Sequence, residues 1–258
     1  MTQEDVSPAP DLRFFDCYVR AGCSIHPPLL PALAPADVIA EMDRCGVDEA
    51  LVHSDALAMT SPVVANAELA ALCAPHPRLH PVWNLLPPQT GEMPTDELVA
   101  GMRESGVKAV AARPADNRFL LNGITFGETL DVLIERRIPL FVPGGGDNWA
   151  RITDLLKDFP TLRLIACEFG VWGQDRYIRP LMARFEGFHI ETSTLELDGG
   201  IPSLVGKYGP RRILFGSGYH RRVMGGASLL LRNLDIDSEA KELIAHGNVE
   251  RLLKEVQL

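Results

Sequence analysis

The chain has 258 residues, of which 46% are hydrophobic, and its formal net charge at pH 7 is −9. This size and apolar content support one full hydrophobic core, which excludes an intrinsically disordered chain and a small disulfide-stapled domain. The acidic balance disfavours nucleic-acid binding, which requires clustered Lys and Arg. No apolar run approaches the roughly 20 residues that span a bilayer.

The cysteines and the N-terminal segment indicate the cellular compartment of the protein. The segment MTQEDVSPAPDLR has neither the basic nor the apolar region of a signal peptide. The cysteines are odd in number and form no CxxC pair, which favours reduced thiols; they are Cys17, Cys23, Cys45, Cys73 and Cys167. We therefore expect a soluble, cytoplasmic protein, with a flexible tail over residues 1–12 and a single domain over residues 13–258.

Strand-like segments recur along the whole chain. Several of them are continuous hydrophobic runs, as expected of strands that are covered on both faces. The predicted strands span residues 13–19, 50–55, 79–86, 107–114, 139–143, 162–169, 188–194 and 212–217.

Helical patterns separate these strands. One apolar stripe over residues 38–45 is followed by Gly46, a residue typical of the position just after a helix. Ser61 and Pro62 form a helix start, residues 152–159 and 178–185 repeat the helical spacing, and Pro160 ends the first of these two. Ser238 opens a final helical region, which Gly247 interrupts before residues 249–256.

Eight strand–helix units in about 250 residues match a (β/α)8 barrel, a fold of class α/β. A doubly wound sheet is the alternative. It usually has fewer strands and a Gly-rich phosphate turn after the first one, and no GxGxxG follows the first predicted strand here. The sequence thus predicts a single-domain TIM barrel.

In such a barrel the catalytic and ligand-binding residues lie at the carboxyl ends of the strands. Reading those ends gives a polar mouth of mixed charge: Tyr18, Arg20, His53, Asp55, Asn84, Arg113, Pro143, Gly144–Gly146, Glu168, Glu191, Ser193, Ser217, Tyr219 and His220. The chain has no HxH, HExxH or paired-Cys motif for a metal, and no GxSxG motif for a nucleophilic serine.

Segments along almost the whole chain resemble the amidohydrolase-related family, a group of metal-dependent TIM-barrel hydrolases and decarboxylases. FFDCYVRAG resembles the first strand of that family, EMDRCGVDEALVHS its first helix and second strand, and PHPRLHPVWNLLP its third strand. ESGVKAVAARP, ERRIPLFVPGG and FPTLRLIACEFG resemble the next three strands, RRILFGSGYH the eighth, and HGNVERLL the closing helix. The order and spacing of these matches imply the same barrel.

The resemblance also implies where a metal would bind, and the sequence departs from the family there. The family's ligand positions fall on Tyr18, Arg20, Pro143, Glu168 and Gly218. Only Glu168 can coordinate a divalent ion, and one carboxylate cannot supply the three or four protein ligands that such a site needs. We therefore expect no metal and no other cofactor. The family's metal-activated water is then not expected either.

Arg20 and Glu168 form the most informative pair. Positions 18 and 20 share one side of the first strand by its period of two, and that side faces the barrel axis. We hypothesise that the Arg20 guanidinium occupies the former metal position and pairs with Glu168. In a functional interpretation Arg20 binds a substrate carboxylate and Glu168 transfers a proton. In a structural interpretation the pair only fills the vacated site.

The remaining candidates also carry two interpretations each. Arg113 would clamp an anion, or pair with Asp116 or Glu191. His53 would contact substrate, or form a buried polar pair with Asp55. The predicted catalytic residues are Glu168 and His220, and the predicted substrate-binding residues are Arg20, Arg113, Tyr18, His53, Asn84 and Ser217.

Three functions remain open at this point. The first is a metal-independent hydrolase or lyase that acts on a small carboxylated or carbonyl substrate. The second is a non-catalytic barrel that serves as a binding or scaffold subunit. The third is a metalloenzyme with a relocated site, built from Glu168, His53 and Asp55. We expect a small-molecule ligand and no nucleic-acid or membrane partner, and the family resemblance implies a possible homodimer.

Overall fold

Eight parallel strands follow one another around a barrel in the computed structural model, which describes residues 12–22, 34–56, 60–170, 173–195 and 199–258. The strands are β1 (Phe15–Ala21), β2 (Glu49–Ser54), β3 (Leu79–Asn84), β4 (Ala109–Ala111), β5 (Leu140–Pro143), β6 (Leu164–Cys167), β7 (Phe188–Glu191) and β8 (Ile213–Leu214). The barrel closes where the Cys17 N–H donates to the Phe215 carbonyl at 2.8 Å and the Gly218 N–H donates to the Tyr18 carbonyl at 3.0 Å. The predicted single-domain (β/α)8 barrel is confirmed.

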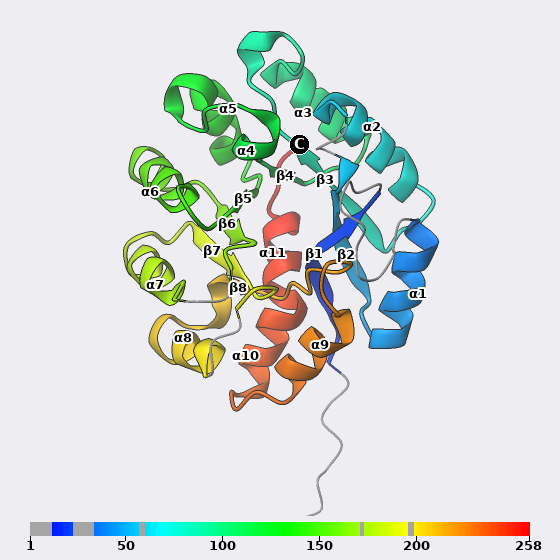
Figure 1. Ribbon diagram of the computed structural model, residues 1–258, viewed down its shortest axis with the longest axis vertical. Helices are drawn as coiled ribbons and strands as arrows, with labels where there is room; N and C mark the ends of the chain where they lie inside the picture. Colours follow the sequence, from blue (N-terminus) through cyan, green and yellow to red (C-terminus); the bar gives the residue numbers. More distant parts are fainter. Residues whose placement is uncertain (1–11, 23–33, 57–59, 171–172, 196–198) are drawn as a thin grey trace, which may run out of the picture.

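All helices but the last form an outer ring around the strands (Figure 1). The helices are α1 (Pro35–Cys45), α2 (Pro62–Cys73), α3 (Thr95–Glu104), α4 (Pro114–Asn117), α5 (Gly123–Glu135), α6 (Asn148–Asp158), α7 (Asp175–Arg184), α8 (Gly200–Tyr208), α9 (Met224–Arg232), α10 (Ser238–Glu242) and α11 (Asn248–Lys254). Their ends follow local rules: Gly46 adopts a left-handed φ of 66° after α1, and the Ser61 hydroxyl accepts from the Val63 N–H at 3.3 Å before α2.

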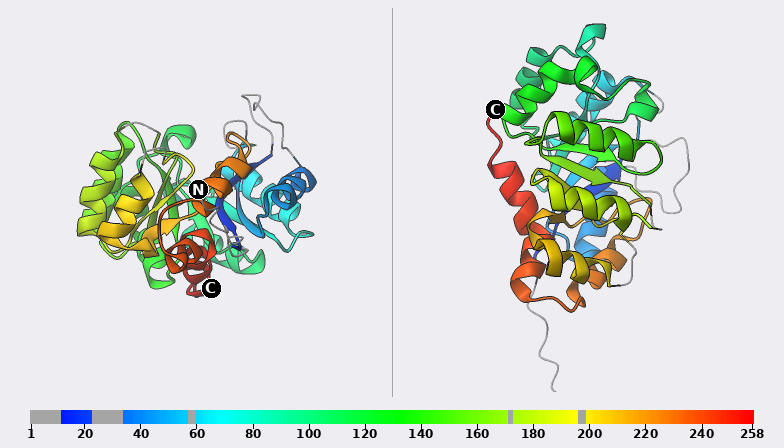
Figure 2. Two further views of the ribbon diagram at one scale, coloured as in Figure 1. Left: turned by 90° about the horizontal axis from the view of Figure 1, so that it is seen from below. Right: turned by 90° about the vertical axis from the view of Figure 1, so that its left-hand side faces the viewer.

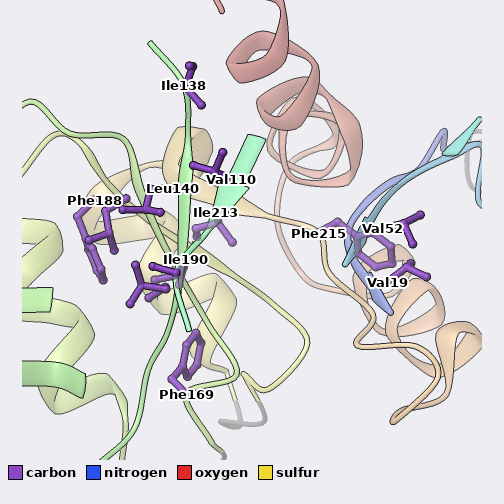
Figure 3. Close-up of a cluster of buried hydrophobic side chains, with 14 of the residues drawn as sticks. Val19, Val52, Val110, Ile138, Leu140, Phe169, Phe188, Ile190, Ile213 and Phe215 are labelled. Atoms are coloured by element: carbon purple, nitrogen blue, oxygen red, sulfur yellow. The ribbon is translucent and has the colours of Figure 1, made fainter. Parts of the chain in front are cut away.

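Apolar side chains pack in two layers. The outer cluster fills the space between strands and helices, and Figure 3 shows part of it, with Val110 of β4, Leu140 of β5 and Ile190 of β7 labelled. A second cluster fills the inside of the barrel and includes Phe141 and Leu214. Because each strand is covered on both faces, its sequence is nearly continuously apolar.

The C-terminal helix closes one end of the barrel. After a π-helical turn at Leu243–Gly247, α11 contributes Val249, Leu252 and Leu253 to the inner cluster. It crosses the centre of the ring in Figure 1 and runs along one side of the barrel in Figure 2. The interruption predicted at Gly247 is the point where α11 begins to cover the amino ends of the strands.

Residues 1–11 of the predicted flexible tail lie outside the described residues. Its last residue, Leu12, is buried in the outer cluster. Among the helices of the described segments, none has both the length and the apolar content that crossing a membrane requires. The cytoplasmic location stays a prediction.

Candidate functional site

A β-bulge in β1 sets the direction of the side chains at the barrel mouth. Asp16 pairs with Ala50 and Val19 with Val52, so two residues of β1 oppose one residue of β2. Cys17 and Tyr18 therefore both join the inner cluster. The expected common side of Tyr18 and Arg20 is observed, because both side chains contact groups inside the barrel.

The predicted ion pair of Arg20 and Glu168 is present. The Arg20 side chain is 5% exposed, and its guanidinium contacts two carboxylates: Nη1 donates to Oε1 of Glu168, and Nε pairs with Oδ1 of Asp55. Three strands meet in this contact, since Arg20 is the second-last residue of β1, Asp55 follows β2 and Glu168 follows β6.

Arg113 reaches the same carboxylate from β4. Its Nη1 donates to Oε2 of Glu168 at 3.1 Å, and its Nη2 donates to the Tyr18 hydroxyl at 2.6 Å. The expected contact with Asp116 is also present at 3.7 Å. The Arg113 side chain is 4% exposed, so this guanidinium is held inside the barrel and not at its rim.

Glu168 bridges two guanidinium groups in an uncommon backbone conformation. Its φ is +47°, a left-handed value that side chains other than Gly adopt rarely and that clusters at functional sites. Burial alone raises the pKa of Glu168, but Arg113, Arg20 and Arg221 lower that pKa well below the usual range of a carboxyl. The Glu168 carboxylate is therefore ionised at neutral pH.

Asp55 joins the loop after β8 to this network. His220 Nε2 lies 2.7 Å from Oδ2 of Asp55, and both side chains are buried. Arg221 Nη2 lies 3.3 Å from Oδ1 of Asp55, and Arg221 Nη1 lies 3.6 Å from Oε1 of Glu168. The Arg221 side chain is 47% exposed, so Arg221 presents a guanidinium of the network to solvent.

His53 lies in the interior with its own set of partners. Its Nε2 is 3.2 Å from the Cys17 carbonyl, and its ring packs 4.5 Å from that of Tyr18 and 4.9 Å from that of Phe141. Burial lowers the pKa of His53 to about 3, so this imidazole is neutral. The polar pair expected of His53 with Asp55 is wrong: within the described segments no hydrogen bond or ion pair joins them, because Asp55 turns to Arg20 and to the β8 loop instead.

Asn84 and Ser217 are both buried, and their hydrogen bonds are made with other protein groups. The Asn84 N–H donates to the side-chain oxygen of Asn66 at 2.8 Å, while the Asn84 amide group has no hydrogen-bond partner in the described part of the chain. The Ser217 N–H donates to Asp16 at 3.0 Å, and the Ser217 hydroxyl accepts from the Tyr219 N–H at 3.1 Å. Their substrate-binding roles stay predictions.

Glu191, expected from the sequence as an alternative partner of Arg113, forms no ion pair with it in the described residues and is a buried acid with other partners. Its carboxyl accepts from the Ser193 N–H at 2.6 Å, the Ser193 hydroxyl at 2.8 Å and the Glu168 N–H at 3.1 Å. Burial raises the pKa of Glu191 to about 7. Asp16 is similar, since burial raises its pKa to about 6. Both acids lie within apolar runs, which is the only sequence signal that would single them out.

The residues at the family's metal-ligand positions do not fit a divalent cation. Guanidinium groups have no lone pair to donate, and both oxygens of Glu168 already accept from guanidinium groups. The Tyr18 hydroxyl, at another of these ligand positions, already accepts a hydrogen bond from Arg113. The described part of the chain contains no group of three or more His, Cys, Asp or Glu side chains suited to a metal. The relocated set of Glu168, His53 and Asp55 is therefore not such a group.

Comparison with protein families identifies the group to which this barrel belongs. Residues 31–254 match the model of the family described as amidohydrolase. The chain belongs to the amidohydrolase family. The sequence matches none of the curated proteins.

Solved structures share the fold at low sequence identity. An uncharacterised TIM-barrel protein from Bordetella bronchiseptica is 19% identical with a TM-score of 0.72, over 95% of this chain and 99% of that one. The 5-carboxyvanillate decarboxylase of Sphingomonas paucimobilis is 15% identical with a TM-score of 0.71, over 95% and 100%. That of Novosphingobium aromaticivorans, complexed with manganese and 4-hydroxy-3-methoxy-5-nitrobenzoic acid, is 15% identical with a TM-score of 0.73, over 98% and 99%.

Proposed function

We propose that this amidohydrolase-family protein is an enzyme that binds a small carboxylated substrate at the barrel mouth and acts on it without a metal, by hydrolysis or lyase chemistry. One observation carries the proposal: the guanidinium groups of Arg20, Arg113 and Arg221 all contact the single carboxylate of Glu168. Their other acidic partners are Asp55 and Asp116, and Asp116 is 47% exposed and 3.7 Å from Arg113, so solvent screens its charge. The crowding of three guanidinium groups around one carboxylate favours a further anion. Two of the similar structures are 5-carboxyvanillate decarboxylases, and one of these is complexed with manganese and 4-hydroxy-3-methoxy-5-nitrobenzoic acid.

Arg221 is the group best suited to contact the substrate. Its contacts with Asp55 and Glu168, at 3.3 and 3.6 Å, are longer than an optimal charge-assisted hydrogen bond. The Arg221 side chain is also partly in solvent, so the carboxylate of a substrate can accept hydrogen bonds from its N–H groups with little loss of existing contacts. Arg20 and Arg113 are buried and already paired, so in this proposal they fix the local potential and keep the two carboxylates in place.

His220 is the better of the two predicted proton-transfer residues. Its Nε2 lies 2.7 Å from Oδ2 of Asp55, and this contact holds the imidazole beside the arginine cluster. Both ring nitrogens are buried, and neither makes a hydrogen bond of good geometry among the described residues. Glu168 is less suited to accept or donate a proton, because the surrounding arginines keep its pKa low. Its role in this proposal is electrostatic.

A non-catalytic barrel is the second candidate, and one observation favours it. The Arg20 and Arg113 side chains are almost fully buried and paired with protein carboxylates, so side chains fill the position that the metal has in the family. A barrel of this kind could bind an anion at Arg221 and carry out no reaction.

The test is turnover by the full-length chain after treatment with EDTA and dialysis. Hydroxybenzoates, including 5-carboxyvanillate, and carboxylated esters and lactones serve as substrates, with product detection by chromatography. We expect turnover of at least one carboxylate without added metal. His220→Asn should lower kcat by about 10²-fold or more, the usual contribution of a general acid or base.

Variants separate the two candidates. Arg221→Gln should raise KM by about tenfold or more, because it removes a charge-assisted contact to the carboxylate, whereas Arg103→Gln, an exposed change on α3, should leave KM unaltered. Activity that requires added zinc or manganese would refute the metal-independent proposal. Carboxylate binding that Arg221→Gln abolishes, with no turnover of any substrate, would support the non-catalytic barrel.

A further inference from the structure

A polar cavity lies at the other end of the barrel from the mouth. It has a volume of about 580 Å³ and is bounded by α11 and by the turns that lead into β6, β7 and β8. Arginines dominate its walls: Arg163, Arg211, Arg212 and Arg251. We call this space the basal cavity. The amino ends of the strands surround it, whereas the residues proposed for the reaction lie at their carboxyl ends.

The positive charge of the basal cavity is poorly compensated. Arg163 pairs with Glu255, but no ion pair within the described segments involves Arg211, Arg212 or Arg251. Glu186, the acidic residue of the cavity wall, is exposed and forms none either. His189 also lines the cavity and is neutral, because burial lowers its pKa to about 4.

Backbone carbonyls, and not acidic side chains, hold two of these guanidinium groups in position. Arg212 Nη1 donates to the carbonyls of Met182 at 2.8 Å and Phe185 at 3.0 Å. Arg251 Nη2 donates to the carbonyl of Arg211 at 3.0 Å. Neutral acceptors fix the orientation of a guanidinium without cancelling its charge. The remaining N–H groups are thus preorganised for an anion.

Of the four guanidinium groups, that of Arg251 is the one with a buried and unpartnered atom in the described part of the chain. Its Nε atom is buried and has no hydrogen-bond partner among the described residues. Burial lowers the pKa of Arg251, and the like charges of Arg211 and Arg163 lower it further, against an opposite effect of Glu255. A buried N–H donor without an acceptor is costly, and an anionic oxygen would relieve both this cost and the charge repulsion.

We propose that the basal cavity binds the phosphate group of a small molecule. Three guanidinium groups without acidic partners match a dianionic or more highly charged group, whereas a single carboxylate would leave most of their charge uncompensated. Phosphate offers several oxygens to the planar N–H forks of arginine. The cavity volume lies within the range of small-molecule sites, roughly 300–1,000 Å³. A large polyanion such as a nucleic acid is disfavoured by the net charge of −9.

The experiment is isothermal titration calorimetry of the full-length chain with pyrophosphate, inorganic phosphate and acetate. Free phosphate and a phosphate ester present the same group, so glycerol 3-phosphate is titrated as well to distinguish the two sources. We expect pyrophosphate, phosphate or the ester to bind at least about tenfold more tightly than acetate, in keeping with the higher charge. Binding should weaken with added salt.

Matched variants assign the binding to the basal cavity. Arg251→Gln and Arg211→Gln should each weaken phosphate binding about tenfold or more, and Arg251→Lys should weaken it less than Arg251→Gln because it keeps the charge. Arg211 is exposed and only its backbone carbonyl is used by Arg251, so Arg211→Gln tests the site without disturbing the fold. Arg103→Gln controls for net charge, and Arg221→Gln controls for the mouth.

The outcomes are distinct. Loss of phosphate binding in both basal variants and its retention in Arg103→Gln and Arg221→Gln would support the site. Loss in Arg221→Gln with full binding in Arg211→Gln would assign the anion to the mouth and overturn the proposal. Equal affinities for phosphate and acetate, or no measurable heat with any phosphate compound at millimolar concentration, would overturn it as well. None of these results depends on turnover at the mouth.

Discussion

Each oxygen of the Glu168 carboxylate accepts from a different guanidinium, Oε1 from Arg20 and Oε2 from Arg113. Replacing this acid with an amide leaves two buried cations with one fewer counter-charge. We expect Glu168→Gln to lower the free energy of unfolding by about 3 kcal/mol, the usual cost of breaking a buried pair from one side. Urea denaturation measures it. Glu186→Gln, an exposed acid without an ion pair in the described residues, should change it by less than about 0.5 kcal/mol.

The buried carboxyl of Glu191 makes the free energy of unfolding depend on pH, and substitution of this residue isolates its contribution. Its pKa is about 7 in the folded chain against 4.5 for an ordinary Glu, so between these pH values the folded state holds a proton that the unfolded state has lost. Ionised Glu191 therefore destabilises the fold as the pH rises from about 4.5 to about 7, by on the order of 3 kcal/mol.

The measurement is the difference between wild type and Glu191→Gln. Buried His53 and His189, with pKa values of about 3 and 4, act in the opposite direction over part of this range but are common to both proteins. Urea denaturation at pH 5 and at pH 7.5 should show that the free energy of unfolding of wild type falls relative to that of the variant. A constant difference between the two proteins would mean that Glu191 does not titrate in this range.

Some of the mouth could be predicted residue by residue and some could not. The pairing of Arg20 with Glu168 follows from the alternation of β1 and from the convergence of the family's ligand positions. The role of Asp55 as the partner of His220 does not, because it depends on the path of the loop after β8. Arg221 shares this difficulty: its neighbours in the sequence are polar, and only the fold brings it to Glu168.

At the scale of the elements, close contact between the ends of β5 and β6 places Glu168. A Cβ on Gly144, just after β5, would lie 2.4 Å from the Cβ and 3.1 Å from the Cα of Phe169, the residue after Glu168. Gly144→Ala would push these strand ends apart and move the Glu168 carboxylate. We expect a loss of about 2 kcal/mol in the free energy of unfolding, typical of an overpacked site, and weaker carboxylate binding.

Gly127 of α5 provides a matched control for this substitution. A Cβ there meets no atom within 4 Å, and the residue lies inside a helix. Gly127→Ala should therefore raise the free energy of unfolding by about 0.5–1 kcal/mol, since alanine favours helix. Thermal denaturation of the two variants beside wild type should give shifts of opposite sign, and a destabilised Gly127→Ala would contradict the helix argument.

The positions of the strands could be predicted from their apolar runs, but several of their ends could not. The predicted segment 212–217 contains β8, yet only Ile213–Leu214 is regular strand. Phe215 and Gly218 bond to Cys17 and Tyr18 outside the regular strand β8, at the residues where β1 also carries its bulge against β2. A bulge has no apolar periodicity of its own, so the sequence shows strands to either side of the bulge and not the bulge itself.

For the molecule as a whole, the order of eight strand–helix units determines which residues face the mouth and which face the basal cavity. The mouth was within reach of prediction, since the family's ligand positions lie at the carboxyl ends of the strands. The basal cavity was not, because its arginines are scattered along the chain and gather only when the turns before β6, β7 and β8 meet α11. Each arginine alone resembles an ordinary surface charge.

The packing of α11 against the inner cluster, at the amino ends of the strands, predicts how the molecule unfolds. Leu252 is 2% exposed and contributes to the inner cluster, whereas Leu229 on α9 is 62% exposed. We expect Leu252→Ala to lower the free energy of unfolding by about 2–5 kcal/mol, the usual cost of a core cavity, and Leu229→Ala to change it by less than about 0.5 kcal/mol.

The measurement for this last pair is urea denaturation followed by far-ultraviolet circular dichroism and by tryptophan fluorescence. Trp83 packs against α3 and Trp149 against Phe169, so fluorescence reports on two separate sides of the barrel. Because α11 packs against the shared interior, we expect both signals of Leu252→Ala to move together to lower urea concentration, as one cooperative unit requires. Two separated transitions would mean that the sides of the barrel unfold independently and that α11 does not bind them into one core.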